Sequence, residues 1–436
     1  MALTIIICSV TALLVMLSVL IKPEFSLGKL KLGTYWVVAF IGAIILLVTG
    51  CLPFGELIGG LTQNTSVNPL KILVLFFSMT SLSVYLDVLG FFRFLANAVL
   101  KRAGHNQKTL FLFLYLTVSV LTVFTSNDII ILTFTPFICF FAKKAKISPL
   151  PYLISEFVAA NTWSMALIIG NPTNIYLASS AGVEFMGYLK VMALPTLVAG
   201  FTSFIVLYAL FHKKLREAIT PNVSDEPVRD KPLLVVGIIH LALCTILLTV
   251  SSYIKLDMWV ISLGFAVSLF VCTAVICLVR RKPISVLYRT FARLPFELIP
   301  FVISMFIIVL SLNYAGATKL IANLFTDKFA VLSFGFTSFL SANIINNIPM
   351  SVLFSSVLEN TSLTQAGYMQ GLFACIAGSN IGAYLTPVGA LAGIMWSSIL
   401  KRYAIELPFK KFIKYGFIVS IPTLLSVLSI LYVVLC

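Results

Sequence analysis

The segment TVFTSNDIIILTFTP, residues 122–136, places Ser126, Asn127 and Asp128 side by side within one of the most apolar stretches of the chain. In hydrocarbon an unpaired polar group costs on the order of several kcal/mol, so such a segment is tolerated only where protein encloses it. The stretch predicts a helical hairpin whose tip lines a cavity. A carboxylate there would be paired with a cation or protonated, and both states suit a coupling site. Alternatively, Asp128 only caps the second helix.

The composition places this hairpin in a polytopic membrane protein. The chain has 436 residues, of which 60% are hydrophobic and 10% charged, and this excludes an ordinary soluble domain. The net charge of +15 comes from basic residues that cluster in short loops, as membrane topology requires, so we expect a lipid bilayer and no nucleic acid as partner. The first apolar run lacks the features of a cleaved signal peptide, so we expect a retained helix.

Ten apolar runs are long enough to cross the hydrocarbon core, which takes about 20 residues. They lie near residues 3–21, 33–52, 70–90, 150–181, 188–211, 233–252, 257–279, 298–315, 366–400 and 415–435. Two further segments, 109–142 and 329–358, are interrupted by polar residues. The first divides into arms of about 17 and 14 residues, too short to span comfortably, and basic clusters flank both of its ends. We therefore predict two re-entrant helical hairpins.

The distribution of basic residues predicts the orientation. With both termini outside, 25 of the 30 Lys and Arg residues fall on the cytoplasmic side and five outside. Such asymmetry is the expected signature of a multi-pass protein of the cell membrane. The hydrophilic segment 212–232 then forms a cytoplasmic linker.

The two halves of the chain resemble each other. Asn127-Asp128 matches Asn346-Asn347 at an offset of 219, GNPT (170–173) matches LTPV (385–388) at 215, and FLANAV (94–99) matches LIANLF (320–325) at 226. Residues 1–211 would form one repeat, with hairpin 109–142 and broken helix 150–181. Residues 233–436 would form the second, with hairpin 329–358 and broken helix 366–400. An odd number of crossings inverts the second repeat, as in secondary transporters whose site lies where broken helices meet.

The helix breaks contain the remaining polar candidates. Pro172 and Pro387 each remove a helical hydrogen bond, and Gly170 and Gly389 loosen the adjacent turns, which frees carbonyl groups that can coordinate a cation. Asn161, Thr162 and Ser164 before the first break, and Ser379 and Asn380 before the second, could face the same cavity. Three other polar residues within or beside apolar runs are weaker candidates: Asp87 and Glu156, near the cytoplasmic ends of their spans, and His240, expected to be a packing element.

Four motifs together resemble the ion transporter superfamily, especially its arsenical pump membrane protein (ArsB-type) permeases. They are SNDIIILTFTP (126–136), GNPTN (170–174), ANIINNIPMSVLF (342–354) and GSNIGAYLTPVGALAGIMW (378–396). The chain is also similar to divalent anion/sodium symporters, although their hairpin tips usually read Ser-Asn-Thr where this chain has Asp128 and Asn347. Some arsenite permeases carry an acidic residue at the position of Asn380.

This resemblance implies an all-α, elevator-type transporter with an inverted-topology repeat of about ten transmembrane helices, two re-entrant hairpins and two broken helices. Substrate would sit between the hairpin tips. The residues implied for substrate are Ser126, Asn127, Thr173, Asn346, Asn347 and Thr386. Those implied for the coupling ion, Na⁺ or H⁺, are Asp128, Gly170, Asn171, Pro172, Asn174, Asn380, Pro387 and Gly389. We expect no cofactor and no metal other than this Na⁺.

Three functions remain open. Ion-coupled secondary transport of a small inorganic oxyanion or metalloid leads, with extrusion of arsenite or antimonite favoured because the motifs most resemble that branch. Sodium-coupled uptake of a di- or tricarboxylate or of sulfate is the second, since amides, hydroxyls and helix N-termini bind such anions. A sodium/proton antiporter is the third. The chain lacks HExxH, GxSxG and P-loop motifs, so we expect neither an enzyme nor direct ATP hydrolysis. We expect a homodimer, and a separate ATPase subunit stays open as a partner.

Overall fold

The computed structural model describes residues 1–21, 24–27, 30–62, 68–104, 106–216, 230–251 and 253–435. Most of the predicted linker 212–232 lies outside the described residues. The described chain is almost entirely helical, and its one sheet is a two-stranded antiparallel pair, β1 (Glu24–Leu27) with β2 (Leu30–Gly33). The all-α fold class predicted from the sequence is therefore confirmed.

The first half consists of spanning helices, a hairpin, a broken helix and a final long helix. In chain order the helices are α1 (Ala2–Ile21), α2 (Thr34–Val48), α3 (Phe54–Thr62), α4 (Pro69–Val88), α5 (Phe91–Ala103), α6 (Gln107–Phe124), α7 (Asn127–Ala145), α8 (Leu150–Trp163), the 3-10 turns η1 (Ser164–Ala166) and η2 (Ile168–Gly170), α9 (Pro172–Ser180) and α10 (Phe185–Phe211). Helices α6 and α7 form the first hairpin, and α8 with α9 form the first broken helix.

The second half repeats this order. After the turn η3 (Lys214–Arg216) come α11 (Lys231–Thr249), α12 (Met258–Val279), α13 (Ser285–Phe291), α14 (Leu298–Tyr314), α15 (Ala317–Ala322), the turn η4 (Asp327–Phe329), α16 (Ala330–Ile345), α17 (Asn347–Glu359), α18 (Gln365–Gly382), α19 (Leu391–Arg402) and α20 (Phe409–Leu435). Helices α16 and α17 form the second hairpin, and α18 with α19 form the second broken helix.

Local backbone geometry strengthens the correspondence between the halves. Helices α4 and α14 end at positions 88 and 314, which are 226 residues apart, and each is followed by a glycine in the left-handed region, Gly90 (φ 87°) and Gly316 (φ 77°). Glycine tolerates this conformation without steric cost, so the chain turns sharply in each half, into the short helices α5 and α15. The last helices, α10 and α20, each have 27 residues.

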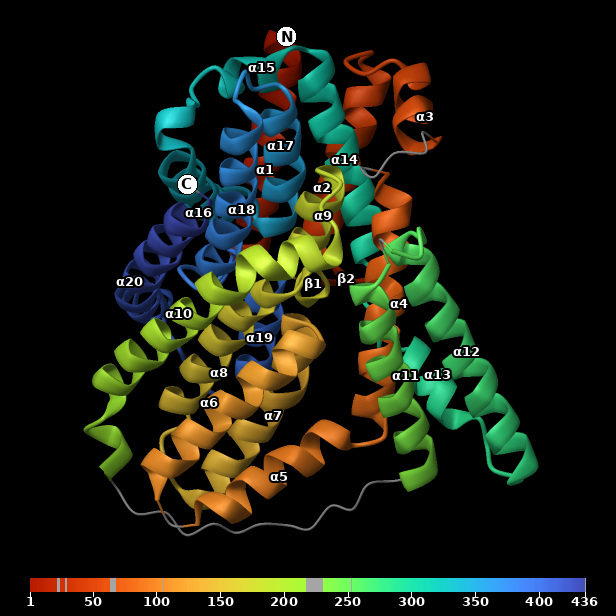
Figure 1. The fold of residues 1–436 in the computed structure, drawn as a ribbon, viewed down its shortest axis with the longest axis vertical. Coiled ribbons are helices and arrows are strands. Elements are labelled where there is room, and N and C mark those ends of the chain that lie inside the picture. The colour runs from red at the N-terminus through yellow and green to blue at the C-terminus, as the bar shows by residue number, and fades with distance from the viewer. Residues whose placement is uncertain are drawn as a thin grey trace.

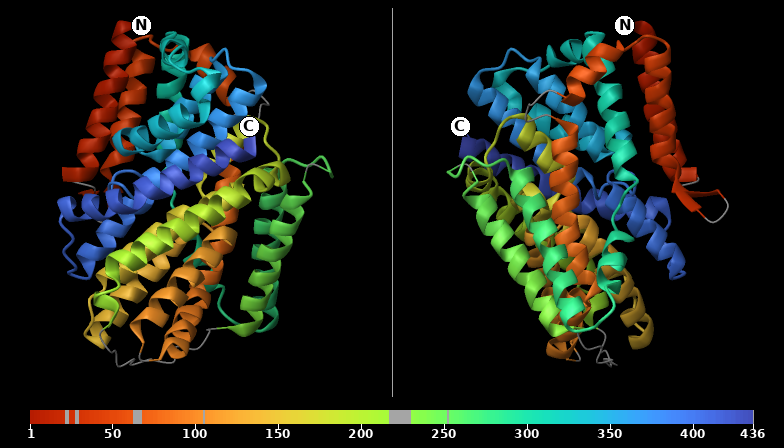
Figure 2. Two further views of the ribbon diagram at one scale, coloured as in Figure 1. Left: turned by 60° about the vertical axis from the view of Figure 1, so that its left-hand side comes forward. Right: turned by 90° about the vertical axis from the view of Figure 1, so that its right-hand side faces the viewer.

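The packing joins the two halves. Helices α10 and α20 pack along each other and run diagonally across the molecule (Figures 1 and 2). Within each half, the first hairpin arm packs on the broken helix, α6 on α8 and α16 on α18. The second arm also packs on the short part of the other half's broken helix, α7 on α19 and α17 on α9. The two hairpins and the two breaks are thereby brought into one region.

Helix length and surface chemistry agree with a membrane location. Among the described residues, seven helical segments are long and apolar enough to span, and three shorter apolar helices are Ala2–Ser18, Thr34–Val48 and Leu298–Tyr314. On α12, Val267, Val271 and Val275 are each about half exposed along one face, as expected for contact with lipid. One estimate was wrong: the first hairpin's arms have 18 and 19 residues, so their shortness does not distinguish a hairpin from two spans.

The helix starts also correct one of the sequence matches. Helices α9 and α19 begin at positions 172 and 391, 219 residues apart, so GNPT corresponds to GALA (389–392) and not to LTPV. Helices α7 and α17 begin at positions 127 and 347, 220 residues apart, which is within one residue of the offset of 219 predicted for the hairpin tips.

Candidate functional site

A network of buried amides connects the two broken helices. The side-chain nitrogen of Asn380, on α18, donates to Asn174 Oδ1 at 2.7 Å, and Asn380 Oδ1 accepts from Ser164 Oγ at 2.8 Å and from Asn171 Nδ2 at 3.0 Å. Asn174 in turn donates to the carbonyl oxygens of Ser164 and Leu167. The four polar residues of this network are fully or almost fully buried. Asn380 thus connects residues before and after the first break.

The first break is built by glycine, proline and a capping asparagine. A Cβ on Gly170 would collide with the carbonyl oxygen of Ser164, so the chain can pass here only without a side chain. Pro172 occupies the first turn of α9, where its missing N–H has no helical partner to lose. Asn171 caps α9 by accepting from the Thr173 N–H at 3.1 Å. GNPT therefore both ends one helical segment and begins the next.

The tip of the first hairpin contacts the first broken helix. Asn127 Nδ2 donates to Asn161 Oδ1 on α8 at 3.1 Å, and both side chains are buried. Ser126 is the N-cap of α7, although its side chain makes no capping hydrogen bond, and Asp128 lies in the first turn. The alternative in which Asp128 is the N-cap is therefore wrong.

The tip of the second hairpin contacts the loop of the second broken helix. Asn346 Nδ2 donates to the Val388 carbonyl at 2.9 Å, and the Asn347 N–H donates to the Gly389 carbonyl at 3.1 Å. Asn346 has φ 73° and ψ 155°, a region occupied almost only by glycine. Such a backbone costs roughly 1–3 kcal/mol and persists only where the surroundings enforce it. The contacts with the loop hold this tip in a strained shape.

The loop between α18 and α19 is organised by a residue outside the predicted set. Asn343 Oδ1 accepts from both the N–H and the hydroxyl of Thr386, at 3.0 and 2.8 Å, and Asn343 Nδ2 donates to the Gly382 carbonyl at 3.0 Å. A Cβ on Gly389 would lie 2.8 Å from Asn343 Oδ1. Thr386 is thus engaged with α16, and Pro387 lies on the wall of a separate cavity. The sequence feature that could have identified Asn343 as a site residue is its position as an amide within an apolar run.

Four buried oxygen atoms around this network have no protein partner. Among the described residues, eight buried side-chain N or O atoms lack a hydrogen-bond partner, and four of them belong to the tips and breaks: Ser126 Oγ, Thr173 Oγ1, Asn347 Oδ1 and Ser379 Oγ. Buried polar atoms are normally satisfied, so each of these four oxygens is available for a hydrogen bond with another molecule.

Helix N-termini add a second feature to the site. Helices α7, α9, α17 and α19 all begin at the tips or breaks, at Asn127, Pro172, Asn347 and Leu391. The first N–H groups of a helix carry partial positive charge and point toward the region before it. The candidate site therefore combines uncharged amides and hydroxyls with four helix starts.

Asp128 faces a different space from the amide network. It lines a cavity of about 500 Å³ together with Tyr35, Thr80 and Leu391, and with residues of the loop before α14 such as Glu297. Among the described residues, its carboxylate has no hydrogen-bond or ion-pair partner. The structure brings Asp128 close to the start of α19 but not into the network of Asn171, Asn174 and Asn380.

Two of the weaker candidates have defined partners. Asp87 accepts from the Thr133 hydroxyl on α7 at 3.0 Å and forms an ion pair with Arg293 at 2.7 Å. His240 contacts the Val236 carbonyl and Ser268 Oγ, which confirms its interpretation as a hydrogen-bonded packing residue.

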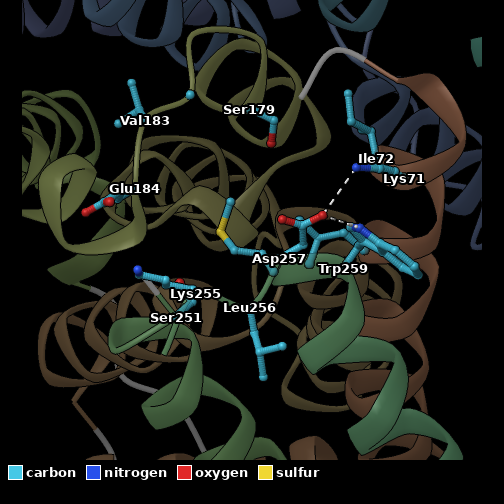
Figure 3. A pocket seen from close by; sticks show the side chains of 13 residues that line it. Lys71, Ile72, Ser179, Val183, Glu184, Ser251, Lys255, Leu256, Asp257 and Trp259 are labelled. Carbon is cyan, nitrogen blue, oxygen red and sulfur yellow. Dashed lines mark hydrogen bonds and ion pairs between the residues drawn. The ribbon is translucent and has the colours of Figure 1, made fainter. Parts of the chain in front are cut away.

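A further cavity, of about 480 Å³, lies between α4, the α9–α10 connection and the α11–α12 connection. Figure 3 shows the Lys71–Asp257 ion pair, 3.2 Å long, with the Trp259 indole donating to the same carboxylate at 3.0 Å. Glu184 and Lys255 lie on the other side of this cavity (Figure 3). None of the predicted site residues lines it.

A helical membrane chain whose two hairpins and two broken helices converge on a buried polar network has the architecture of secondary transporters built from inverted repeats. A solved structure with the same fold is the YdaH transporter of Alcanivorax borkumensis, with a TM-score of 0.56, 13% sequence identity, and coverage of 99% of this chain and 97% of that one. The family described as Citrate transporter (CitMHS) matches residues 19–374, and the chain belongs to this family of the ion transporter superfamily. The resemblance to the ion transporter superfamily, predicted from the motifs, is confirmed.

Relatives of similar length include two named as pump proteins and one named only as a membrane protein. The arsenical pump membrane protein of Escherichia coli is 23% identical over 92% of this chain and 93% of its own length. That of Yersinia enterocolitica is 23% identical over 90% and 92%. A 46 kDa membrane protein of Mycobacterium leprae is 25% identical over 80% and 83%. The chain is thus a multi-pass membrane protein of a transporter family.

Proposed function

We propose that this protein is an ion-coupled, elevator-type secondary transporter that moves arsenite or antimonite across the membrane. The observation that carries the proposal is the set of partnerless buried oxygens of the tips and breaks, at Ser126, Thr173, Asn347 and Ser379, together with an amide network that joins both halves. Two breaks and two hairpin tips converge there, as expected of a substrate site in an inverted-repeat transporter.

The chemistry of the site favours an uncharged, hydroxyl-bearing substrate. At neutral pH arsenite exists as a neutral trihydroxide, whose O–H groups both donate and accept hydrogen bonds. Hydroxyls and amides can satisfy these groups without burying an uncompensated charge. Among the described residues, no group of three or more His, Cys, Asp or Glu could hold a metal ion, so hydrogen bonding and not thiolate coordination would recognise the metalloid.

The coupling ion would act at Asp128 and at carbonyl oxygens of the breaks. Asp128 borders a cavity and has no partner among the described residues, so it can bind Na⁺ or H⁺ from water. In the proposed cycle the hairpins and broken helices move together against the remaining helices. A homodimer, a separate ATPase subunit, and the outside location of both termini belong to the same proposal.

A second candidate is sodium-coupled transport of a di- or tricarboxylate or of sulfate. The starts of α7, α9, α17 and α19 at the site favour it, because helix N-termini bind anions. The family description, Citrate transporter, also supports it.

Growth of arsenite-sensitive cells tests the first proposal. Cells lacking their own pump should gain arsenite resistance when they express the protein, and Asp128→Asn should lose it. Glu56→Gln is a matched control, because Glu56 is an exposed carboxylate on α3, away from the site. Resistance that persists in Asp128→Asn would remove this carboxylate from the coupling mechanism.

Uptake into proteoliposomes separates the two candidates. Arsenite, antimonite, citrate, succinate and sulfate would each be offered with sodium or with choline as the external cation. Arsenite movement without citrate movement supports the metalloid transporter. Sodium-stimulated citrate or succinate uptake without arsenite movement would replace it with the second candidate.

A further inference from the structure

Glu156 is a fully buried carboxylate where three helices from both halves meet. It lies on α8, with none of its surface exposed. The Thr135 hydroxyl, on α7, lies 2.9 Å from Oε1 and 3.1 Å from Oε2, and the Trp396 indole N–H, on α19, donates to Oε2 at 3.3 Å. The carboxyl group therefore connects the second arm of the first hairpin to the second broken helix.

Among the described residues, no positively charged group is paired with Glu156. None of the ion pairs within the described residues includes it, and its two hydrogen-bonding partners are neutral. The titratable group that faces it from α7 is the Cys139 thiol. On α19 and α20, Trp396 and Phe412 pack with Phe157 in an aromatic cluster, with ring centroids 5.1 to 5.7 Å apart.

Both protonation states of this carboxyl group can satisfy their hydrogen bonds. The ionised form accepts from Thr135 and Trp396. The neutral form donates its O–H to Thr135 Oγ1 and still accepts from Trp396 on the other oxygen. An ionised carboxylate without a cation is costly in a low-dielectric interior, so the closed arrangement seen here favours the neutral form.

Water can reach one side of the site. A cavity of about 640 Å³ is lined by Pro387, Trp396, Lys401, Glu406 and Phe412, on the side where the basic residues predict cytoplasm. Trp396 is both a wall of this cavity and a hydrogen-bond donor to Glu156. Trp396 thus connects the carboxyl group with the wall of this cavity, and Lys401 and Glu406 are the charged residues that line it.

We propose that Glu156 is a proton-binding site that couples release of a proton to the cavity with separation of α19 from α7 and α8. The proton passes from the carboxyl oxygen to water in the cavity, and the carboxylate left behind requires hydration, which the closed packing excludes. This inference rests on the proposed transport function. It adds a titratable site distinct from Asp128, which lines the other cavity.

Infrared spectroscopy of the purified full-length protein in nanodiscs at neutral pH tests the protonation directly. The spectrum of the wild type minus that of Glu156→Gln should contain the carbonyl stretching band of a protonated carboxylic acid. Glu406→Gln, which changes an exposed carboxylate at the cavity mouth, should leave the band intact. Thr135→Val keeps the acid, removes its hydroxyl partner and should shift the band. Identical spectra of the wild type and Glu156→Gln in this region would overturn the proposal.

Transport assays test the coupling separately. In proteoliposomes, Glu156→Gln should retain arsenite counterflow, which needs no gradient. The stimulation of arsenite transport by a pH gradient should be about tenfold smaller in this variant than in the wild type. Unchanged stimulation in Glu156→Gln would overturn the coupling role. If the wild type shows no arsenite counterflow, the proposed substrate fails, and the infrared band alone decides whether Glu156 holds a proton.

Discussion

Asn380 on α18 donates a 2.7 Å hydrogen bond to the side-chain oxygen of Asn174 on α9, across the boundary between the two halves of the chain. Each asparagine is fully buried and also bonds to backbone carbonyls of its own half, Asn380 to Ile376 and Asn174 to Ser164 and Leu167. The amides therefore fix the geometry of each break and hold the two breaks together. Movement of either broken helix alone would leave buried polar groups unsatisfied.

The first prediction concerns this pair. Asn174→Ala and Asn380→Ala should each lower stability by about 1–3 kcal/mol, because each leaves buried partners unsatisfied. The double variant should lose about 1 kcal/mol less than the sum, because the shared hydrogen bond is lost only once. Thermal unfolding in detergent measures the effect. As a control, Asn360 bonds to Asn313 in another cluster, so Asn360→Ala should be additive with Asn174→Ala.

The second prediction concerns the close approach at Gly170. Gly170→Ala should greatly lower the yield of folded protein and its Tm, because the added methyl group would overlap the Ser164 carbonyl, which also accepts from Asn174. Gly187→Ala, on α10, is the matched control, since nothing lies near its Cβ position, and it should be neutral or stabilising by up to about 1 kcal/mol. Equal behaviour of the two variants would contradict the packing at the break.

Much of this architecture follows from local sequence. The polar triplet that begins at Ser126 predicted the first hairpin tip, because lipid excludes such groups. GNPT predicted the first break, because Gly170 ends one helical segment, Asn171 caps the next and Pro172 fits its first turn. These roles depend only on neighbouring residues. Asn380 was included because it precedes the second break by a few residues. Its partner on α9 could not be predicted, since it lies 206 residues away.

The errors arise where distant contacts decide the structure. LTPV was matched to GNPT, but α19 begins at Leu391, so the counterpart of GNPT is GALA. The intervening loop is held by Asn343 and by the Gly389 carbonyl's bond to the second tip. Glu156 was noted only for its place near the cytoplasmic end of a span, and its hydrogen bond with Trp396, 240 residues further along the chain, was not predicted. Neither contact has a local sequence signal.

The third prediction concerns the strain at Asn346. Asn346→Ala loses the bond to Val388 and keeps a side chain in a conformation that favours glycine. Asn346→Gly loses the same bond but relieves the strain. The glycine variant should therefore be more stable than the alanine variant by roughly 1–3 kcal/mol. Thermal unfolding of the two variants compares them directly, and a more stable alanine variant would show that the tip is relaxed.

The fourth prediction concerns the start of α11, outside the membrane-spanning segments. Asp230 caps this helix and accepts from Lys282 at 2.7 Å and Arg280 at 3.3 Å. The hydrogen bond from the Lys282 ammonium group lowers the pKa of Asp230, and so does the nearby Arg280. Because the pKa is lower in the folded state, the contribution to stability is complete above the unfolded-state pKa of about 3.9 and is lost as pH falls through the folded-state value.

Asp230→Asn should therefore lower stability at neutral pH by up to about 1 kcal/mol, since both basic partners are partly exposed. The difference from the wild type should shrink below about pH 4, where the native carboxyl group also becomes neutral. Unfolding midpoints measured from neutral to acidic pH follow this convergence. Lys282→Gln should reduce the difference at neutral pH, because it removes the stronger partner. A gap between the wild type and Asp230→Asn that widens as pH falls would show that the ion pair does not stabilise the folded state.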